Sequence, residues 1–367
     1  MIYKHFVLLI AMTALISCCN VKRDVAVSII TLAGKTMENN DPDFFLRNII
    51  DIKDSLLYAY FSQKNTNIIN VYRIKEDSLI LYHRFLNWGN GPYEITMPVC
   101  IYDKTTETIS FFENIGKLMR GYQIDLKELK NIDDKSTWRV FNFLEINDIR
   151  FRHGFAYVSD TLLLAIGGMY DDRNILTIIN LNDMKSTYPL EFWPNDGYKT
   201  NTSVKQAVYM DNARLYKNHK LNKFLYVSGN GKYMEVFRIS NNQIVDRLPV
   251  CNLYPKYIQQ GSSYSIKNEE TNQGYYVYVS DTLIYARPIE YTMDMFRSRQ
   301  NNNGYDLNYS NKINIYDWNG NLLKKYEMDV PFYSFVVDEE NNVIYVETDN
   351  LITGKTIIRK YNTLQIM

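Results

Sequence analysis

Tyr278-Val279-Ser280-Asp281-Thr282-Leu283-Ile284-Tyr285 is the stretch that decides the fold, because its first six letters recur unchanged from Tyr157 to Leu162. Looser copies, each a polar tight turn followed by an apolar run, begin near positions 54, 105, 221 and 340. With the turns at 54, 106, 160, 222, 281 and 341 as landmarks, the copies lie 52 to 62 residues apart. A period of this size predicts the blades of a β-propeller, and six copies predict six blades.

Each repeat contains short runs that alternate between apolar and polar residues, which favours strands over helices. In the first repeat we expect four strands, at 44–53, 56–62, 68–74 and 78–85. The fourth repeat is expected to begin its blade at Val204, and Asn319-Gly320 is expected to form a hairpin turn in the fifth. The fold class is therefore all-β, with antiparallel, four-stranded blades.

The sixth repeat lacks a fourth strand before the chain ends. A β-like run, Val25 to Leu32, stands alone before the first repeat. Pairing this run with the last blade would complete that blade and leave the ring without an open seam. We therefore expect the N-terminal strand to close the ring, and a single propeller domain to span residues 25–367.

Composition is compatible with such a domain and excludes one class of partner. The chain has 31 Tyr among 367 residues, and tyrosine suits half-buried strand surfaces. Its 41 basic and 41 acidic residues balance, and no run of five like charges occurs. The chain therefore lacks the basic footprint of a nucleic-acid-binding protein.

The first 17 residues are typical of an export signal: Lys4 precedes the apolar run Phe6 to Ile16, which is too short to span a membrane. The run ends at Leu15-Ile16-Ser17-Cys18, which resembles a bacterial lipobox. In a lipoprotein, cleavage before Cys18 makes this residue the lipidated N-terminus, and several acyl chains hold it firmly in the membrane. An ordinary secretory signal cleaved elsewhere is the alternative. We expect residues 1–17 to be the signal, 18–24 a tether, and Cys18 the membrane anchor.

The lipobox, the repeated Asp-Ser/Thr-Leu turns and the crossing Gly89-Asn90-Gly91-Pro92-Tyr93-Glu94 together resemble the TolB-like six-bladed β-propeller lipoproteins of gut Bacteroides-type bacteria. In that family the crossing often reads Gly-x-Gly-Pro-Gly-Glu, so Tyr93 replaces its last glycine. The resemblance implies the fold and a cell-envelope location, and it supplies no catalytic residues. Residues 19–24 lack the acid-rich patch associated with surface export in such bacteria, which favours an outer-membrane anchor facing the periplasm.

Motifs for metal, cofactor or nucleophilic chemistry are missing from the sequence. The histidines His83, His153 and His219 form no zinc pattern, and neither a phosphate loop nor a nucleophile elbow occurs. Cys100 and Cys251 fall at different phases of the repeat, so we expect two separate thiols rather than a disulfide. No metal and no cofactor are expected, and a binding module is favoured over an enzyme.

Loop lengths indicate where binding resides. Strand direction alternates within a blade, so the loops between second and third strands share one face with the crossings between blades. These loops are long and aromatic, notably at 193–203, 251–273 and 289–311, whereas the turns of the other face are short. Long loops on a rigid scaffold commonly carry binding sites, since aromatic faces suit sugars or peptides and arginine suits carboxylates. The expected ligand-binding residues of this long-loop face are Trp88, Tyr93, Glu94, Trp193, Tyr198, Tyr254, Tyr257, Arg297 and Arg299.

The sequence thus predicts a lipid-anchored envelope propeller that binds a glycan, a peptide or a protein partner through the long-loop face. A hydrolase or lyase that acts on glycans or lactones is a second hypothesis, with Glu94, Asp171 or Asp196 as its acids. A scaffold subunit of an outer-membrane complex is a third. An enzyme should gather acids in one pocket, a binder should show an aromatic groove, and a scaffold should expose a flat apolar patch.

Changing Cys18 to Ala tests the lipobox. Because the thiol is the atom that would carry the diacylglycerol, Cys18→Ala is expected to move the protein from the membrane fraction to the soluble envelope fraction. Fractionation followed by immunoblotting measures this, with Cys19→Ala as the matched control. Retention of the Cys18→Ala protein in the membrane would rule out this anchor.

Overall fold

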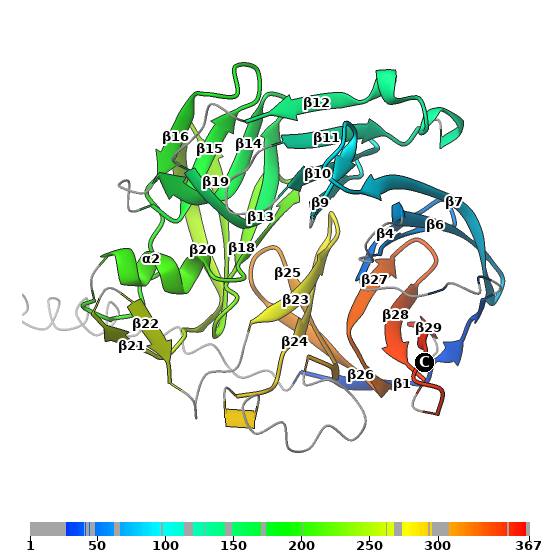
Figure 1. Ribbon diagram of the computed structural model, residues 1–367. Helices are drawn as coiled ribbons and strands as arrows, with labels where there is room; N and C mark the ends of the chain where they lie inside the picture. The colour runs from blue at the N-terminus through cyan, green and yellow to red at the C-terminus, as the bar shows by residue number, and fades with distance from the viewer. Residues whose placement is uncertain are drawn as a thin grey trace, which may run out of the picture.

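The computed structural model describes residues 27–364 apart from 40, 42–43, 45–47, 62–66, 97, 114–119, 128, 144–148, 170–173, 201, 262, 268–273, 293, 296–307 and 351. Six antiparallel sheets stand around one axis, and each sheet is a blade (Figure 1). The chain therefore forms the six-bladed β-propeller that the repeat predicts. Residues 1–24, where a signal and a tether are expected, lie outside the described residues.

Blades one to five each contain four consecutive strands that run from the axis outward. Their bounds are Asn48–Lys53 (β4), Leu56–Tyr60 (β5), Asn67–Lys75 (β6) and Ser78–Trp88 (β7); Pro98–Asp103 (β9), Thr108–Glu113 (β10), Arg120–Asp125 (β11) and Arg139–Asn142 (β12); Ile149–Ser159 (β13), Leu162–Met169 (β14), Leu176–Asn180 (β15) and Thr187–Leu190 (β16); Arg214–Asn218 (β17), Lys223–Val227 (β18), Lys232–Ser240 (β19) and Gln243–Leu253 (β20); Tyr275–Val279 (β23), Leu283–Pro288 (β24), Ser310–Asp317 (β25) and Leu322–Phe332 (β26). The sixth blade has Ser334–Asp338 (β27), Val343–Asp349 (β28) and Thr356–Asn362 (β29) from the end of the chain.

The N-terminal segment closes the ring, but with different residues from those expected. The fourth strand of blade six is Lys35–Thr36 (β2), which pairs antiparallel with β29. Ile29–Leu32 (β1) instead lies parallel to β26 on the outer edge of blade five, and Glu38–Asn39 (β3) lies parallel to β7 on blade one. Assigning Val25 to Leu32 to the last blade was therefore wrong, and Val25 itself lies outside the described residues.

The segment changes blade at Gly34, which packs against the ring of Tyr361 with no room for a Cβ atom. A glycine permits this close passage, so three very short strands can follow three successive blades. We call residues 29–39 the N-terminal strap. The apolar pattern of a short strand does not determine which of two neighbouring sheet edges the strand will join, and this is why the expected blade was wrong.

The repeated Ser-Asp-Thr-Leu letters form the turn between the first and second strands of a blade. In blade five, Ser280 Oγ accepts hydrogen bonds from the backbone N–H of Thr282 (3.2 Å) and of Leu283 (2.9 Å). In blade three, Ser159 Oγ accepts from the N–H of Thr161 (3.4 Å). A hydroxyl that satisfies turn N–H groups explains why the same letters recur at this position.

Two local expectations need correction in blade four. Thr202–Met210 (α2) is a helix, and the blade begins with β17 rather than at Val204. Val204 and Val208 are buried one helical turn apart, a pair that the strand interpretation overlooked. The expected loop 251–273 also contains a hairpin, Tyr257–Gln260 (β21) with Ser263–Ile266 (β22). In the expected turn at Asn319-Gly320, Gly320 adopts a positive φ of 77°.

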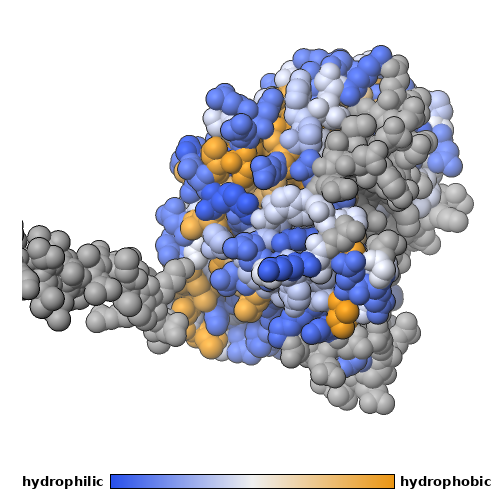
Figure 2. All heavy atoms as spheres, turned by 90° about the vertical axis from the view of Figure 1, so that its left-hand side faces the viewer, coloured by the Kyte–Doolittle hydropathy of each residue, from blue (hydrophilic) through white to orange (hydrophobic). Residues whose placement is uncertain are grey.

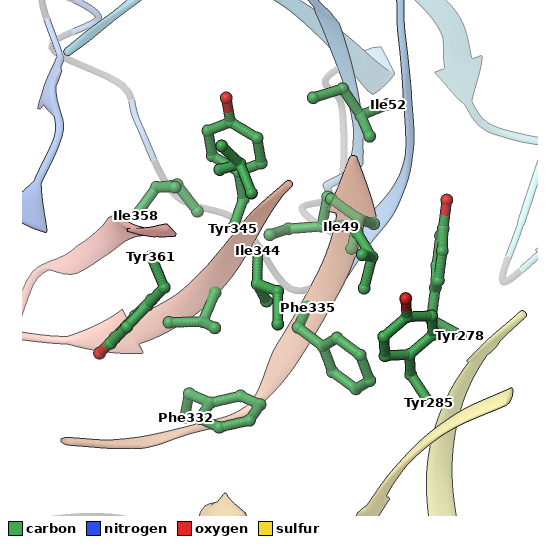
Figure 3. Close-up of a cluster of buried hydrophobic side chains, with 14 of the residues drawn as sticks. Ile49, Ile52, Tyr278, Tyr285, Phe332, Phe335, Ile344, Tyr345, Ile358 and Tyr361 are labelled. Carbon is green, nitrogen blue, oxygen red and sulfur yellow. The ribbon is translucent and has the colours of Figure 1, made fainter. Parts of the chain in front are cut away.

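Apolar side chains gather between neighbouring blades in five clusters, so the core is a ring of interfaces. The largest cluster joins blades five, six and one to the strap (Figure 3). There Phe335 of β27 packs near Tyr278 of β23, with their ring centres 6.4 Å apart, and Leu32 and Met37 of the strap are buried in the same cluster. The strap is thus held by packing as well as by strand pairing.

Cys100, on the inner strand of blade two, and Cys251, on the outer strand of blade four, are both free, half-buried thiols. Burial raises the pKa of the Cys100 thiol far above its usual range. Among residues 27–364, where described, no helix has the length and apolarity needed to cross a membrane.

A matched pair of substitutions tests the strap. Leu32 is 3% exposed and Ile29, on the same strand, is 64% exposed. Leu32→Ala is expected to lower the free energy of unfolding by about 2–5 kcal/mol, because it leaves a cavity in the interface between blades. Ile29→Ala should change it by less than about 0.5 kcal/mol. Chemical denaturation measures both, and equal effects would contradict a packed strap.

Candidate functional site

The inner strands of all six blades surround a cavity of about 860 Å³ on the propeller axis. We call this cavity the axial channel. Residues of β4, β9, β13, β17, β23 and β27 form its wall, and in every blade except the third the turn that follows the inner strand also lines it. The end of the channel where these strands begin lies toward the long loops and is called the long-loop end. The end where they finish lies among turns of two to four residues and is called the short-turn end.

At the short-turn end, a buried carboxylate meets a lysine and a tyrosine from two other blades. Lys104 Nζ lies 3.0 Å from Asp51 Oδ1, and Tyr278 OH donates to the same oxygen at 3.0 Å. The Asp51 side chain is 8% exposed. Burial raises the pKa of Asp51, while the charge of Lys104 acts in the opposite direction. The channel wall thus holds an ion pair that joins the neighbouring blades one and two, and a tyrosine of blade five binds the same carboxylate.

A second polar cluster lies on the wall formed by blades two and four. His219 Nε2 is 3.5 Å from Asp103 Oδ1, and Lys217 Nζ donates to the carbonyl of Val158 at 3.0 Å. Burial lowers the pKa of both His219 and Lys217, and the nearby Asp103 partly offsets this effect. The imidazole is therefore mainly neutral at pH 7, since its pKa falls below the ordinary value of 6.5.

Between blades five and six, Glu339 ties the repeated turn to its neighbour. Its carboxylate accepts hydrogen bonds from Ser280 Oγ (2.6 Å), Thr282 Oγ1 (3.0 Å) and Tyr285 OH (2.9 Å). Charge-assisted hydrogen bonds of this kind hold side chains in one geometry. The short-turn rim is thus fixed by contacts between blades.

The long-loop end of the channel carries arginine and tyrosine. Arg214 is the first residue of β17, and its guanidinium carbon lies 5.1 Å from the ring centre of Tyr276 on β23. Tyr276 OH donates to the side chain of Asn48, and it lies 3.3 Å from the carbonyl of Ile49. A tyrosine of blade five therefore reaches the inner strand of blade one at this end.

Glu347 lies on β28, the strand next to the inner strand of blade six, and it binds a serine at the same end of the channel. Ser334 Oγ donates to Glu347 Oε2 at 2.5 Å and accepts from the N–H of Ile49 at 3.1 Å, which links blade six to blade one. Burial raises the pKa of Glu347 to about 7, and the hydrogen bond from Ser334 opposes this shift. The carboxyl group is therefore partly protonated at neutral pH.

The expected binding residues of the long-loop face fall into two groups that lie in different interfaces. Trp88 and Tyr93 pack in the cluster between blades one and two, where Tyr93 stacks on Tyr122 at 5.9 Å. Glu94 folds back onto its own crossing and accepts from the N–H of Gly91 at 2.8 Å. The glycines of this crossing thus leave room for the side chain of Glu94, which lies against Gly89 and Gly91.

The second group lies over blades three and four, beside α2. The hydrophobic cluster between blades three and four includes Tyr257, and Trp193, Tyr198 and Tyr254 pack against it. The ring centres of Tyr198 and Tyr257 are 4.7 Å apart. None of these residues, nor Trp88, Tyr93 or Glu94, lines the described wall of the channel. Arg297 and Arg299 lie outside the described residues. A single ligand surface built from all nine stays a prediction.

The acids of the hydrolase hypothesis are not gathered in the channel wall. Asp196 accepts from Tyr209 OH and Tyr257 OH, each at 3.0 Å, and pairs with Lys205 at 2.7 Å beside α2. Glu94 caps its crossing, and Asp171 lies outside the described residues. Within the described part of the chain, no group of three His, Cys, Asp or Glu side chains is placed to hold a metal ion.

Sequence reasoning missed the channel residues themselves. Asp51, Asp103 and Lys104 each lie within three positions of a turn landmark, so the repeat already marked where inner strands end. Which of these side chains face one another depends on the closure of the ring, and the sequence carries no direct signal for that.

These features define a class of protein: a six-bladed β-propeller with a polar axial channel. No family model matches the chain, and no curated protein matches it. Among solved structures, a member of the DUF4221 family from Bacteroides vulgatus superposes with a TM-score of 0.51 at 12% identity, covering 90% of this chain and 95% of that chain. This likeness supports the fold alone.

Two further solved structures match more loosely. A protein from Bacteroides fragilis, described as exported, gives a TM-score of 0.48 at 11% identity, covering 91% of this chain and 99% of that chain. The WD40 domain of Toxoplasma gondii coronin gives 0.42 at 9% identity, with 85% and 68% covered. Membership of the TolB-like family stays a prediction.

Glu347→Gln tests the buried carboxyl group behind the channel. Because the folded-state pKa is raised from 4.5 to about 7, the folded protein retains a proton that the unfolded chain releases, so this group's contribution to stability is lost as pH rises from about 4.5 to 7. Gln keeps the hydrogen bond from Ser334 without charge. When the pH is raised from 5 to 8, the native protein should therefore lose up to about 3 kcal/mol of unfolding free energy that the variant keeps.

Denaturation at both pH values measures this loss. Glu340→Gln, which alters an exposed acid of the same blade, is the matched control. A pH-independent difference between Glu347→Gln and the native protein would contradict a titrating buried carboxyl group.

Proposed function

We propose that this protein is an exported, lipid-anchored propeller that binds a small polar ligand, or the end of a larger one, in its axial channel. The observation that carries the proposal is the 860 Å³ cavity, whose wall presents charged and hydroxyl groups from every side of the ring. Ligand pockets of proteins commonly have volumes of about 300–1,000 Å³ and a few well-placed polar groups.

The wall is suited to recognition because its polar groups are held in place before a ligand arrives. Asp51, Lys104 and Tyr278 come from three blades and fix one another, and Glu339 fixes the neighbouring turns. The lowered pKa of Lys217 and the raised pKa of Asp51 show that burial is only partly compensated there. Perturbed groups gathered in one cavity favour a functional site over a structural ion pair.

The proposed location of the protein rests on the N-terminal residues. The export segment and Cys18 support an anchor in the outer membrane, with the propeller facing the periplasm. Ligands available there include envelope glycans and peptides, and both carry the hydroxyl, amide or charged groups that the wall can bind. The aromatic residues over blades three and four are a second proposed contact for a ligand that extends out of the long-loop end.

A scaffold role receives less support from the described surface. Figure 2 looks at the side that carries α2 and the β21–β22 hairpin, where apolar residues form small patches separated by hydrophilic ones. The exposed apolar residues of this region include Leu253 and Ile258, which belong to the end of β20 and to the hairpin. In the part of this side that the structure describes, the broad flat patch expected of a scaffold is not seen.

Blocking the channel tests the proposal. Ile101, in the middle of β9, lines the channel and is only partly buried. Ile101→Trp should narrow the cavity and abolish binding of any ligand found by screening pooled small glycans and peptides with ligand-observed NMR. Ile101→Val, which leaves the channel open, should bind as the native protein does.

Melting curves of both variants establish that the fold is intact. A ligand that binds Ile101→Trp with unchanged affinity would place binding outside the channel and contradict the proposal. A screen in which the native protein binds no member of the pools would also contradict it.

A further inference from the structure

A fully buried arginine stands behind the long-loop end of the channel. Arg287, on β24, is 1% exposed. Its Nη1 donates to the carbonyl of Asn308, and its Nε has no partner among the described residues. Arginine is rarely buried to this extent without a carboxylate, because the desolvation of its charge costs several kcal/mol.

Arg214 is the second positive charge of this region, and it lines the channel. The guanidinium carbons of Arg214 and Arg287 lie 5.1 Å and 5.6 Å from the ring centre of Tyr276. Both arginines therefore lie beside the same tyrosine, and Tyr276 and Arg287 are opposite each other on β23 and β24, adjacent strands of blade five (Figure 1). In the part of the chain that the structure describes, neither arginine forms an ion pair with a carboxylate.

The aromatic surroundings compensate only part of the charge. Arg287 lies 5.6 Å from the Tyr276 ring and 5.9 Å from the Phe332 ring, and such cation–π contacts offset a fraction of the cost of burial. Burial, together with the charge of Arg214, lowers the pKa of Arg287 to about 10. Both groups remain charged at neutral pH, so positive charge accumulates at this end of the channel.

The carboxyl group that could neutralise this charge is engaged elsewhere. Glu347 lies close enough to Tyr276 to affect its pKa, yet it accepts its hydrogen bond from Ser334 and forms no ion pair among the described residues. In the opposite half of the channel, Asp51 is paired with Lys104. Acids thus outnumber lysines in the described lining of the short-turn end, whereas the two arginines of the long-loop end have no carboxylate in an ion pair among the described residues.

We propose that Arg214 and Arg287 form a binding site for an oxyanion, a carboxylate or a phosphate group, of a ligand that enters the long-loop end of the axial channel. This inference rests on the proposed function of the channel and names the chemistry of its ligand. Guanidinium groups bind carboxylate and phosphate through paired hydrogen bonds, and they do so most strongly where water is excluded. Tyr276 holds the two arginines in a shared position before the ligand arrives.

Acidic and neutral forms of one sugar provide the direct test. The purified protein is titrated with glucuronate, glucose 6-phosphate and glucose at constant ionic strength, and binding is followed by calorimetry and by the melting temperature. We expect a saturable rise in melting temperature with at least one of the two acidic sugars and none with glucose. The acidic sugar that binds distinguishes a carboxylate from a phosphate ligand.

Three variants locate the effect. Arg214→Gln should weaken binding of the acidic sugar by roughly tenfold or more, because a charged hydrogen-bond donor is lost. Arg238→Gln is the matched control, since Arg238 is an exposed arginine of the same blade that pairs with Asp246, and it should bind as the native protein does. Arg287→Met should show no rise in melting temperature with the acidic sugar. In buffer without oxyanions it should melt at the same temperature as the native protein or higher, because the substitution removes a buried charge that has no ion-pair partner.

Several outcomes would overturn the site. These are equal stabilisation by glucose and the acidic sugars, unchanged affinity in Arg214→Gln, or a melting temperature of Arg287→Met far below that of the native protein. A ligand that Ile101→Trp excludes but Arg214→Gln binds normally would leave the proposed function intact and refute the oxyanion site. Stabilisation by an acidic sugar that persists in Ile101→Trp and disappears in Arg214→Gln would support the oxyanion site and contradict the proposal that the ligand extends along the channel as far as Ile101.

Discussion

The structure depends on the closure of its ring, and the closure depends on the N-terminal strap. Lys35 and Thr36 pair with Lys360 and Arg359 across the whole length of the sequence, and this pairing supplies the outer strand of blade six. On either side, β1 and β3 extend blades five and one. An open ring would leave the apolar faces of blades six and one in water, so the strap protects an interface as well as a sheet edge. If Cys18 is lipidated, the chain that reaches the membrane is the same chain that closes the propeller.

Closure also creates the channel. Blades pack face to face through their apolar side chains, so the polar groups at the edges of the inner strands turn toward the axis, where they meet. This is why Tyr278 of blade five reaches Asp51 of blade one, and why Ser334 of blade six binds the backbone of Ile49. The same contacts stabilise the ring and define the shape and charge of the cavity. A substitution in one of them is therefore expected to affect both stability and binding.

The two ends of the channel differ in a way that follows from their loops. Short turns bring acids and lysines of neighbouring blades within reach of each other, and some of them form ion pairs, as Lys53 does with Glu107 at 2.6 Å. The long-loop end places two arginines around Tyr276, and neither forms an ion pair with a carboxylate among the described residues. Unpaired buried charge is unfavourable for stability, and such features are commonly retained where binding requires them.

The sequence by itself determined the class of fold, the number of blades and most strand positions, because a polar tight turn and period-two alternation are local properties that recur in each repeat. It did not determine α2, whose Val204 and Val208 also fit a strand, or the register of the strap, since a two-residue strand carries too little pattern to choose its edge. The polar groups of the channel were visible as residues near each turn, but Asp51, Lys104 and Tyr278 are separated by many tens of residues. Only the closed tertiary structure decided that they meet, because a contact across the axis depends on the summed rotation of all six blades rather than on any local preference.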